Sequence, residues 1–238
     1  MNGAYPVDEQ GLAADRERLG RSSTAERVAD VLRDRITDGS YAPGAQLSEE
    51  SVTAALEISR NTLREAFRLL AHERLLVHKL NRGVFVREIG AHDVSDIYRV
   101  RRMLECSAVR AVADTSPRWS SGLTAVARAV EDAEDAARRE AWAEVGTADV
   151  HFHRALTALA GSPRINELMD LLGAELRLVF HTMPDTRALH EPYVPRNREI
   201  LARLQAGDGP GAERLLAAYL DDAESALLDH LASTVGAG

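Results

Sequence analysis

Four polar residues stand within five positions of one another, and their types suit contact with DNA. Arg60 and Arg64 carry planar guanidinium groups that match guanine O6 and N7, and Asn61 matches adenine N6 and N7. The hydroxyl of Thr62 suits a phosphate oxygen, as do the backbone amides of a helix's first turn. If these residues open a helix, they can read base edges in the major groove. The alternative is a set of solvated polar side chains on a small adaptor domain.

The surrounding pattern predicts two helices that would position these side chains. Ser48 is the expected N-cap of a short helix that runs to about Leu56, with acidic residues in its first turn. Ser59 is the expected N-cap of the next helix, which begins with the four polar residues. That helix has an apolar stripe facing the domain core, formed by Leu63, Ala66, Phe67 and Leu70.

A β-hairpin is expected directly after these helices. Two short β-leaning runs flank Asn81-Arg82-Gly83. Two helices, a tight turn and a hairpin predict a winged helix-turn-helix domain over 21–89, with the helix-turn-helix at about 49–68. Arg82 and Gly83 at the hairpin tip are then expected in the minor groove or along the DNA backbone.

A second chemical pattern is the pair Asp149 and His153, which are four residues apart on a predicted helix. At ~100° per residue they lie about 40° apart on one face, whereas His151 points away. A carboxylate and an imidazole on one face form half of a divalent-metal site. They equally suit a polar pair without a ligand, and the residues alone leave both readings open.

Composition limits the classes of protein to which the chain can belong. The 238 residues carry a net charge of −8, yet residues 21–89 hold 11 basic and 10 acidic groups, so the acidity lies elsewhere. A local basic face can therefore still bind phosphates. No apolar run approaches the ~18 residues of a membrane span, and the N-terminus lacks the apolar core of a secretory signal. We expect a cytoplasmic protein that does not associate with membranes.

From Asp93 onward the strand signals disappear. Helices are expected at about 93–115, 118–139, 141–160, 163–182, 195–206 and 210–233, with the longest irregular stretch at 184–197. The predicted fold is mostly α. A disordered tail over 1–20 precedes the winged domain, and a short linker near 88–93 leads to an all-helical bundle over 93–235.

Three motifs of the first domain occur in an order that carries a family resemblance. They are IxxGxYxPGxxL, LEISRNTLREAFRLLAHERLL and NRGVFV. Together they cover about 27–87 and resemble the DNA-binding domain of the GntR family of bacterial transcription regulators. The resemblance implies a dimer on a short pseudo-palindromic operator, with Arg60, Arg64 and Thr62 at the DNA and Gly83 at the wing tip.

Two residues depart from that family pattern. Glu50 stands where some members have a DNA-contacting arginine, so the operator sequence is expected to differ. Glu57 stands at the turn position where the family usually has glycine. If the backbone there keeps a positive φ, a residue with a Cβ carries a strain of about 1 kcal/mol.

The helical domain resembles the FCD type, the effector-binding domain of the FadR-like branch. The motifs are RVRRMLE, DVHFHRALTALAGSPRI and REILARLQAGDGPGAERLLAAYL, within about 93–230. The resemblance implies a metal held by Asp149, His153 and two later histidines, with a small carboxylate effector on the metal. The two later positions fall on Asn197 and Tyr219, which leaves an incomplete ligand set.

Three interpretations of this site remain open. Asp149, His153, Asn197 and Tyr219 could bind an organic effector directly, or a divalent metal (Zn, Ni or Mn) could bind weakly with help from His181 or His190, or the site could be packed and vestigial. Arg101 matches a position that the family points at the effector, and its guanidinium suits a carboxylate. A surface ion pair with Glu105, four residues on, is the alternative for Arg101.

The sequence thus predicts a homodimeric regulator, and not an enzyme, that binds a double-stranded DNA operator and responds to a small organic acid or acyl compound. We expect the protein to repress transcription and the ligand to relieve that repression. One rival is a metal-dependent hydrolase that uses Asp149 and His153, although it would need more ligands and a general base. The other rival is a DNA-binding module without a ligand.

Overall fold

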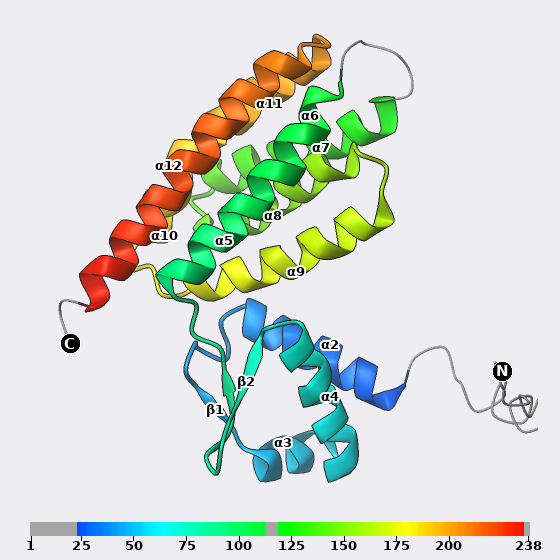
Figure 1. Ribbon diagram of the computed structural model, residues 1–238, viewed down its shortest axis with the longest axis vertical. Helices are drawn as coiled ribbons and strands as arrows, with labels where there is room; N and C mark the ends of the chain where they lie inside the picture. Colours follow the sequence, from blue (N-terminus) through cyan, green and yellow to red (C-terminus); the bar gives the residue numbers. More distant parts are fainter. Residues whose placement is uncertain (1–22, 113–118, 236–238) are drawn as a thin grey trace, which may run out of the picture. The chain divides into compact units, whose positions relative to one another are not determined.

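The computed structural model describes residues 23–112 and 119–235. The chain divides into two compact units between Arg87 and Glu88, and Figure 1 shows the elements of each. The tail expected over 1–20 lies outside the described residues. None of the helices in the described ranges has the length and apolar character needed to cross a membrane.

The first unit contains three described helices and three short strands. Its elements are α2 (Thr24–Thr37), β1 (Gln46–Leu47), α3 (Glu49–Leu56), α4 (Arg60–His72), β2 (Leu76–Lys79) and β3 (Gly83–Val86). Ser23 begins α2 as half of a capping box with Glu26. Ser48 and Ser59 are the N-caps of α3 and α4, as the sequence predicts.

The sheet has the strand order β1-β3-β2, and both pairs are antiparallel. β2 and β3 form the expected hairpin with Lys79 opposite Gly83, so the tip is the segment 80–82. β1 adds a third strand through Gln46 opposite Phe85, which the sequence does not predict. Two residues carry too little periodic signal to predict a strand.

The core of the first unit is the apolar face of α4. Leu63, Phe67 and Leu70 are fully buried there, as the stripe predicts. Arg33 on α2 binds Glu73 beside the end of α4 through two hydrogen bonds, from Nε to Oε2 at 2.6 Å and from Nη2 to Oε1 at 2.7 Å. The unit is a winged helix-turn-helix, in which α3 and α4 are the two helices of the motif and β2 and β3 form the wing.

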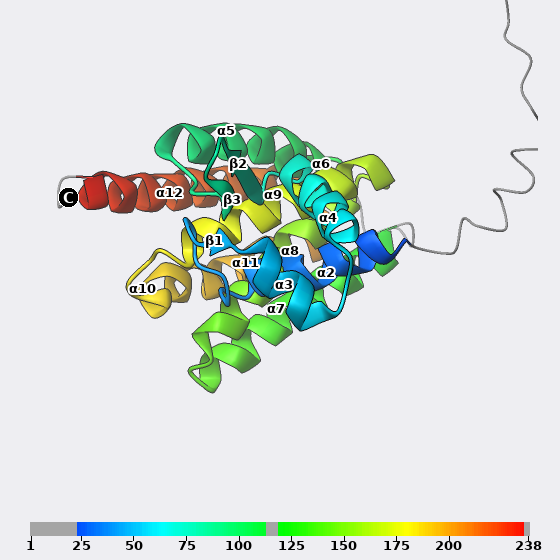
Figure 2. The ribbon, with the colours of Figure 1, turned by 90° about the horizontal axis from the view of Figure 1, so that it is seen from below.

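The second unit is all helical in its described part. Its helices are α5 (Ala91–Arg101), a π-helix (Arg102–Cys106), α6 (Ser107–Arg110), α7 (Ser120–Arg138), α8 (Trp142–Ala158), α9 (Pro163–Phe180), α10 (Thr186–His190), a 3₁₀ turn (Glu191–Tyr193), α11 (Val194–Gln205) and α12 (Gly209–Val235). α5 and α12 lie side by side, and the C-terminal end of α12 projects beyond the other helices of this unit (Figures 1 and 2).

Two expectations for this unit are wrong in detail. The helix expected over 93–115 is interrupted by the π-helix Arg102–Cys106, whose single widened turn is too short to show in a sequence pattern. The stretch expected to be irregular at 184–197 contains α10, whose N-cap Asp185 accepts a hydrogen bond from the backbone N–H of Ala188 at 3.0 Å. Five residues are too few for a helical period to show.

Candidate functional site

The first candidate site is the exposed first turn of α4. The Ser59 hydroxyl accepts a hydrogen bond from the backbone N–H of Thr62 at 3.1 Å and lies 2.8 Å from the Thr62 hydroxyl. Arg60 and Asn61 are exposed beside them. This turn presents two hydroxyls, an amide and a guanidinium group from a rigid helix end, which suits contact with a nucleic acid.

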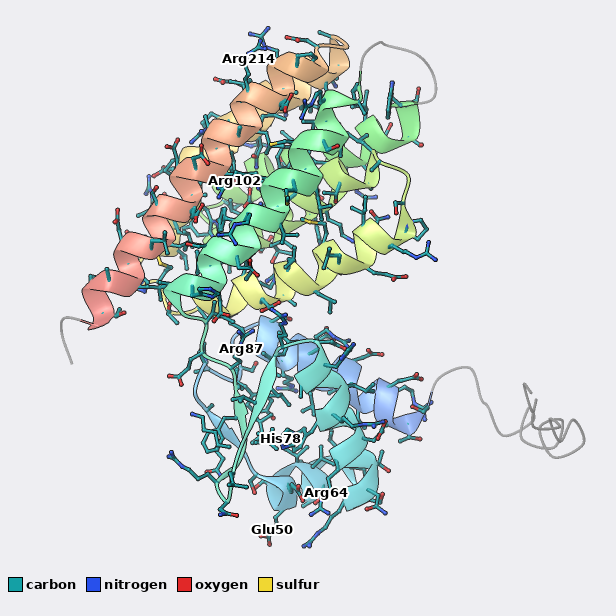
Figure 3. All side chains as sticks on the ribbon, in the orientation of Figure 1. Glu50, Arg64, His78, Arg87, Arg102 and Arg214 are labelled. Atoms are coloured by element: carbon teal, nitrogen blue, oxygen red, sulfur yellow. The ribbon has the colours of Figure 1, made fainter. Side chains whose placement is uncertain are left out.

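Arg64 lies one turn further along and is held by Glu49 on α3. Its Nε lies 3.2 Å from both carboxylate oxygens of Glu49, and its Nη2 lies 3.1 Å from Oε2. The Arg64 side chain is still 63% exposed, so binding DNA only requires it to exchange this carboxylate for a base edge or a phosphate. Figure 3 shows Arg64 and Glu50 at the same end of the unit.

The wing tip is held in place by β1. Gln46 Nε2 donates a hydrogen bond to the carbonyl oxygen of Arg82 at 2.8 Å, and Gly83 has φ +100°, which favours glycine. The Lys79 Nζ lies 4.6 Å from the centre of the Phe85 ring, over its face. The hairpin therefore presents its cations on a supported tip, together with Leu80, which is 89% exposed.

The second candidate site is a buried group of six side chains from α5, the π-helix, α8, α11 and α12, here called the polar cluster. It consists of Arg101, Glu105, Asp149, His153, Asn197 and Tyr219. Asp149 Oδ1 accepts hydrogen bonds from Asn197 Nδ2 at 2.9 Å and from the Tyr219 hydroxyl at 2.8 Å. The structure thus brings together every residue that the sequence assigned to the effector site.

Glu105 connects two of these residues. Arg101 Nε donates to Glu105 Oε1 at 2.7 Å, and Glu105 Oε2 lies 2.6 Å from His153 Nδ1. The ion pair between Arg101 and Glu105 does form, but the two residues are only 4% and 0% exposed, so the surface pair expected as the alternative is wrong. A buried charge is stable only with such partners.

The cluster favours charged carboxylates despite its burial. Burial raises the pKa of Glu105, but the charges of Arg101 and His153 outweigh it, so the pKa lies below its usual value. Burial likewise raises the pKa of Asp149, and nearby His153 and His190 together with the Asn197 and Tyr219 hydrogen bonds lower it below the usual value. The two carboxylates are therefore anionic at neutral pH.

Two buried polar atoms of the polar cluster have no hydrogen-bond partner among the described residues. They are His153 Nε2, which lies 3.8 Å from Asp149 Oδ2, and Asn197 Oδ1. A cavity of about 20 Å³ adjoins Arg101, Asp149 and His153, and its apolar wall comes from α9 through Met169, Leu176 and Phe180. That volume holds about one water molecule. The cluster can therefore give hydrogen bonds to a small polar ligand if α9 makes room.

The residues of the cluster do not fit the divalent metal that the family resemblance implies. Asn197 and Tyr219 direct N–H and O–H donors, not lone pairs, at Asp149. Burial and the Asp149 charge raise the pKa of Tyr219 well above 10, so the phenol keeps its proton. Across the part of the chain that the structure describes, no group of three or more His, Cys, Asp or Glu side chains is placed to hold a metal ion. Neither His181 nor His190 thus completes a ligand set.

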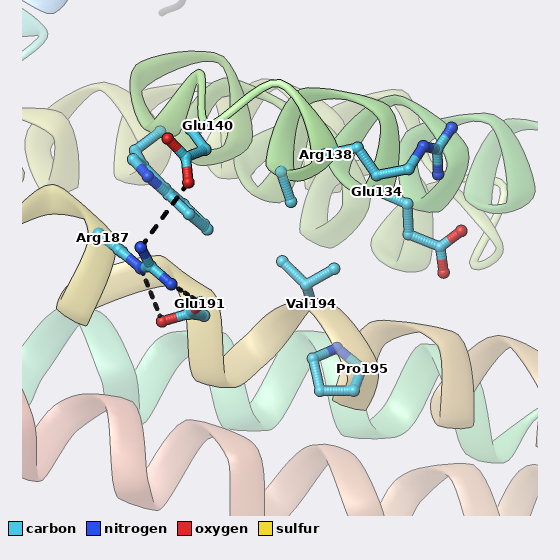
Figure 4. A pocket seen from close by; sticks show the side chains of 9 residues that line it. Glu134, Arg138, Glu140, Arg187, Glu191, Val194 and Pro195 are labelled. Atoms are coloured by element: carbon cyan, nitrogen blue, oxygen red, sulfur yellow. Dashed lines mark hydrogen bonds and ion pairs between the residues drawn. The ribbon is translucent and has the colours of Figure 1, made fainter.

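A larger groove of about 440 Å³ lies on the surface of the second unit, between the end of α7 and the segment that contains α10 (Figure 4). Arg187 lies over the Trp142 ring at 5.3 Å and binds Glu191 with two hydrogen bonds of 3.0 and 2.8 Å. Glu134 binds Arg198 in the same way. The charged groups named here are already paired, and none of the predicted site residues lines this groove.

Three residues of these sites escape prediction from the sequence. They are Glu49, which holds Arg64, Gln46, which holds the wing tip, and Glu105, which orients His153. The i,i+4 spacing from Arg101 does point to Glu105 as a partner, but only the fold shows that His153, 48 positions away in the chain, shares it.

Family models match both units. The model for bacterial regulatory proteins of the gntR family matches residues 24–86, and the FCD domain model matches residues 96–222. The chain is 28% identical over 213 residues to a protein from Paenarthrobacter nicotinovorans described as a probable D-xylose utilization operon transcriptional repressor, covering 88% of this chain and 92% of that one. It is 26% identical to the transcriptional repressor RspR of Escherichia coli K12, covering 83% and 86%.

Solved structures agree with these matches. A GntR transcriptional regulator from Rhodococcus sp. RHA1 is 47% identical, with a TM-score of 0.81 over 87% of this chain and 99% of that one. E. coli McbR/YncC, at 23% identity, shares the fold with a TM-score of 0.72 over 87% and 98%. The relatives described as transcriptional repressors do not favour the hydrolase alternative. The chain belongs to the GntR family with a C-terminal FCD domain, and it is a DNA-binding transcription regulator and not an enzyme.

Proposed function

We propose that this regulator is a cytoplasmic repressor that binds a pseudo-palindromic operator as a homodimer and is released by a small organic acid. Residues 21–89 form its DNA-binding domain, and residues 93–235 hold the effector and the dimer contact. The exposed first turn of α4, which begins at Arg60, is the observation that carries the DNA-binding part. Relatives named as repressors support the proposal that this regulator represses transcription. Among them is the gluconate operon repressor of Bacillus subtilis, which is 36% identical over 100 residues.

On DNA, each part of the winged domain has its own task. Arg60, Asn61 and Arg64 read base edges in the major groove. The hydroxyl groups of Ser48, Ser59 and Thr62 bind phosphates and so position the domain on the DNA. The wing tip at Arg82 and Gly83 lies in the minor groove or along the backbone. Because Glu50 replaces an arginine found in some members, the operator differs from theirs at the base pair that this arginine reads.

The effector binds at the polar cluster. Arg101 faces its carboxylate, and Asp149, His153, Asn197 and Tyr219 face its other polar groups. His153 Nε2 and Asn197 Oδ1 support this assignment. A buried polar atom without a hydrogen-bond partner lowers the stability of the fold, and a bound effector would supply that partner. The cavity of about 20 Å³ is too small for an acid. Effector entry therefore displaces α9.

The DNA-binding part is tested with two recognition-helix variants. A duplex selected by the chain from a random-sequence pool is titrated with the parent, Arg60→Ala and Arg64→Ala, and binding is followed by fluorescence anisotropy. Each variant is expected to lose about 1–3 kcal/mol of binding free energy. Arg99→Ala is the matched control, because Arg99 is a similarly exposed, ion-paired arginine in the other unit. Parent-like binding by both α4 variants would overturn the placement of the recognition helix.

The effector part is tested on the same complex. A panel of small organic acids and acyl compounds is added to the chain bound to the selected duplex, and release of the DNA is recorded. An acid that releases DNA from the parent should act more weakly on Tyr219→Phe, which keeps the ring and removes one donor of the polar cluster. If no member of the panel changes DNA affinity while the duplex binds well, the ligand-independent module becomes the better description.

A further inference from the structure

Outside the DNA-binding unit, the negative charge of Asp149 is stabilised in an unusual way by the polar cluster. Asn197 on α11 and Tyr219 on α12 both donate to the same oxygen, Oδ1, at 2.9 and 2.8 Å. Both residues are buried, with exposures of 1% and 2%. A buried carboxylate needs either a cation or such donors, and here two neutral donors fill that role.

The orientation of the Asn197 amide follows from the same contact. Its nitrogen faces the Asp149 carboxylate, so turning the amide to offer its carbonyl oxygen would set two acceptors against each other. Tyr219 likewise has to give up its bond to Asp149 before its oxygen can face a cation. Next to Asp149, the nitrogen within reach of a metal is His153 Nε2, 3.8 Å from Asp149 Oδ2, because His153 Nδ1 is already committed to Glu105.

We infer that Asn197 and Tyr219 exclude a divalent metal from this site, and that exchanging both for histidine creates a metal centre. The fold already places these two positions within hydrogen-bond distance of Asp149, and Asp149 lies one helical turn from His153. Four ligands, one carboxylate and three imidazoles, then face one point, and that donor set suits Zn²⁺ or Ni²⁺. In the natural chain the ligand must bind to protein groups directly.

The test is the metal content of the full chain, purified without a tag or chelator. The parent and the double variant Asn197→His/Tyr219→His are each exposed to Zn²⁺, Ni²⁺ or Mn²⁺, desalted, and analysed by elemental mass spectrometry. The parent is expected to retain far less than one ion per chain, and its melting temperature should respond neither to metal nor to EDTA. The double variant should retain about one Zn²⁺ or Ni²⁺ per chain, and its melting temperature should rise with metal concentration.

Two controls separate a designed site from histidines that bind metal at random. Asn197→His combined with Tyr193→His adds the same two imidazoles, but Tyr193 packs against the ring of Tyr219 at 4.5 Å and makes no hydrogen bond to Asp149. That pair should retain no more metal than Asn197→His alone and much less than the Asn197→His/Tyr219→His variant. Adding Asp149→Asn to the double variant should abolish its metal uptake, because the carboxylate ligand is lost.

Two results would overturn the inference. One is a parent chain that retains about one metal ion per chain and melts lower after EDTA. The other is a double variant whose far-UV circular dichroism matches the parent and which takes up no metal. If the double variant does not fold, the metal content of the parent still decides, and Asn197→His alone should take up more metal than the parent does. No DNA or effector is present, so the result is independent of the DNA-binding test.

Discussion

At the scale of single residues, the turn before α4 is strained at Glu57. This residue ends α3 with φ 52° and ψ 43°, in the left-handed region where a Cβ is unfavourable. Glu57→Gly is expected to stabilise the DNA-binding unit by about 0.5 kcal/mol, because a left-handed strain of about 1–2 kcal/mol exceeds the added chain entropy of about 0.5–1 kcal/mol. Native-state hydrogen exchange at the buried Phe67 amide measures the change.

The matched control for this prediction is Glu50→Gly, in the first turn of the same helix. No strain is relieved there, so glycine should destabilise the unit by about 0.5–1 kcal/mol. Equal effects of the two substitutions would show that the left-handed conformation of Glu57 costs nothing measurable.

Residues with local roles are the ones that the sequence reveals. Ser48 and Ser59 cap helices through contacts three residues away, and Asp149 and His153 share a helix face by spacing alone. Partners from distant segments are different. Nothing in the spacing shows that Glu105 meets His153, because that contact depends on how α5 and the π-helix pack on α8.

At the scale of elements, α9 is the wall between the small cavity and the outside of its unit. Leu176 on α9 is 3% exposed and lines the cavity. Leu176→Ala is expected to enlarge the cavity and to destabilise the helical unit by about 2–5 kcal/mol. Urea unfolding followed by tryptophan fluorescence measures this, since Trp119 and Trp142 both belong to this unit.

Leu168→Ala provides the comparison on the same helix. Leu168 is 39% exposed, so its truncation removes little buried surface and should cost well under half as much. If both truncations cost the same, α9 does not form a packed wall over the polar cluster.

The sequence predicts a helix well where the apolar residues repeat with helical spacing over many residues. α7, α8 and α9 each span at least 17 residues, and the expected segments match them to within a few positions. β1, α10 and the π-helix are two to five residues long, and their conformation is set by tertiary contacts such as Gln46 opposite Phe85. Propensity over so few residues is outweighed by packing.

At the scale of the whole molecule, the two units must act as one for an effector to matter. The net charge of −8 repels DNA at long range, whereas the face that we propose contacts DNA carries Arg60, Arg64 and Arg82. Specific binding therefore depends on a small cationic surface within an acidic chain. In the proposed dimer, a modest change in how two such surfaces are presented is enough to alter operator occupancy, because a coupling of about 1–3 kcal/mol changes affinity some 5- to 150-fold.

Reciprocity gives the sharpest prediction for the whole molecule. If an acid lowers DNA affinity by some factor, DNA must lower the affinity for that acid by the same factor, because the thermodynamic cycle closes. Calorimetry compares titration of the acid into the free chain and into its complex with the selected duplex. With Arg60→Ala/Arg64→Ala, at a duplex concentration where this variant stays unbound, the duplex should leave acid affinity unchanged. Unequal factors in the parent would mean that the acid acts outside this two-site cycle, for example by binding the DNA surface itself.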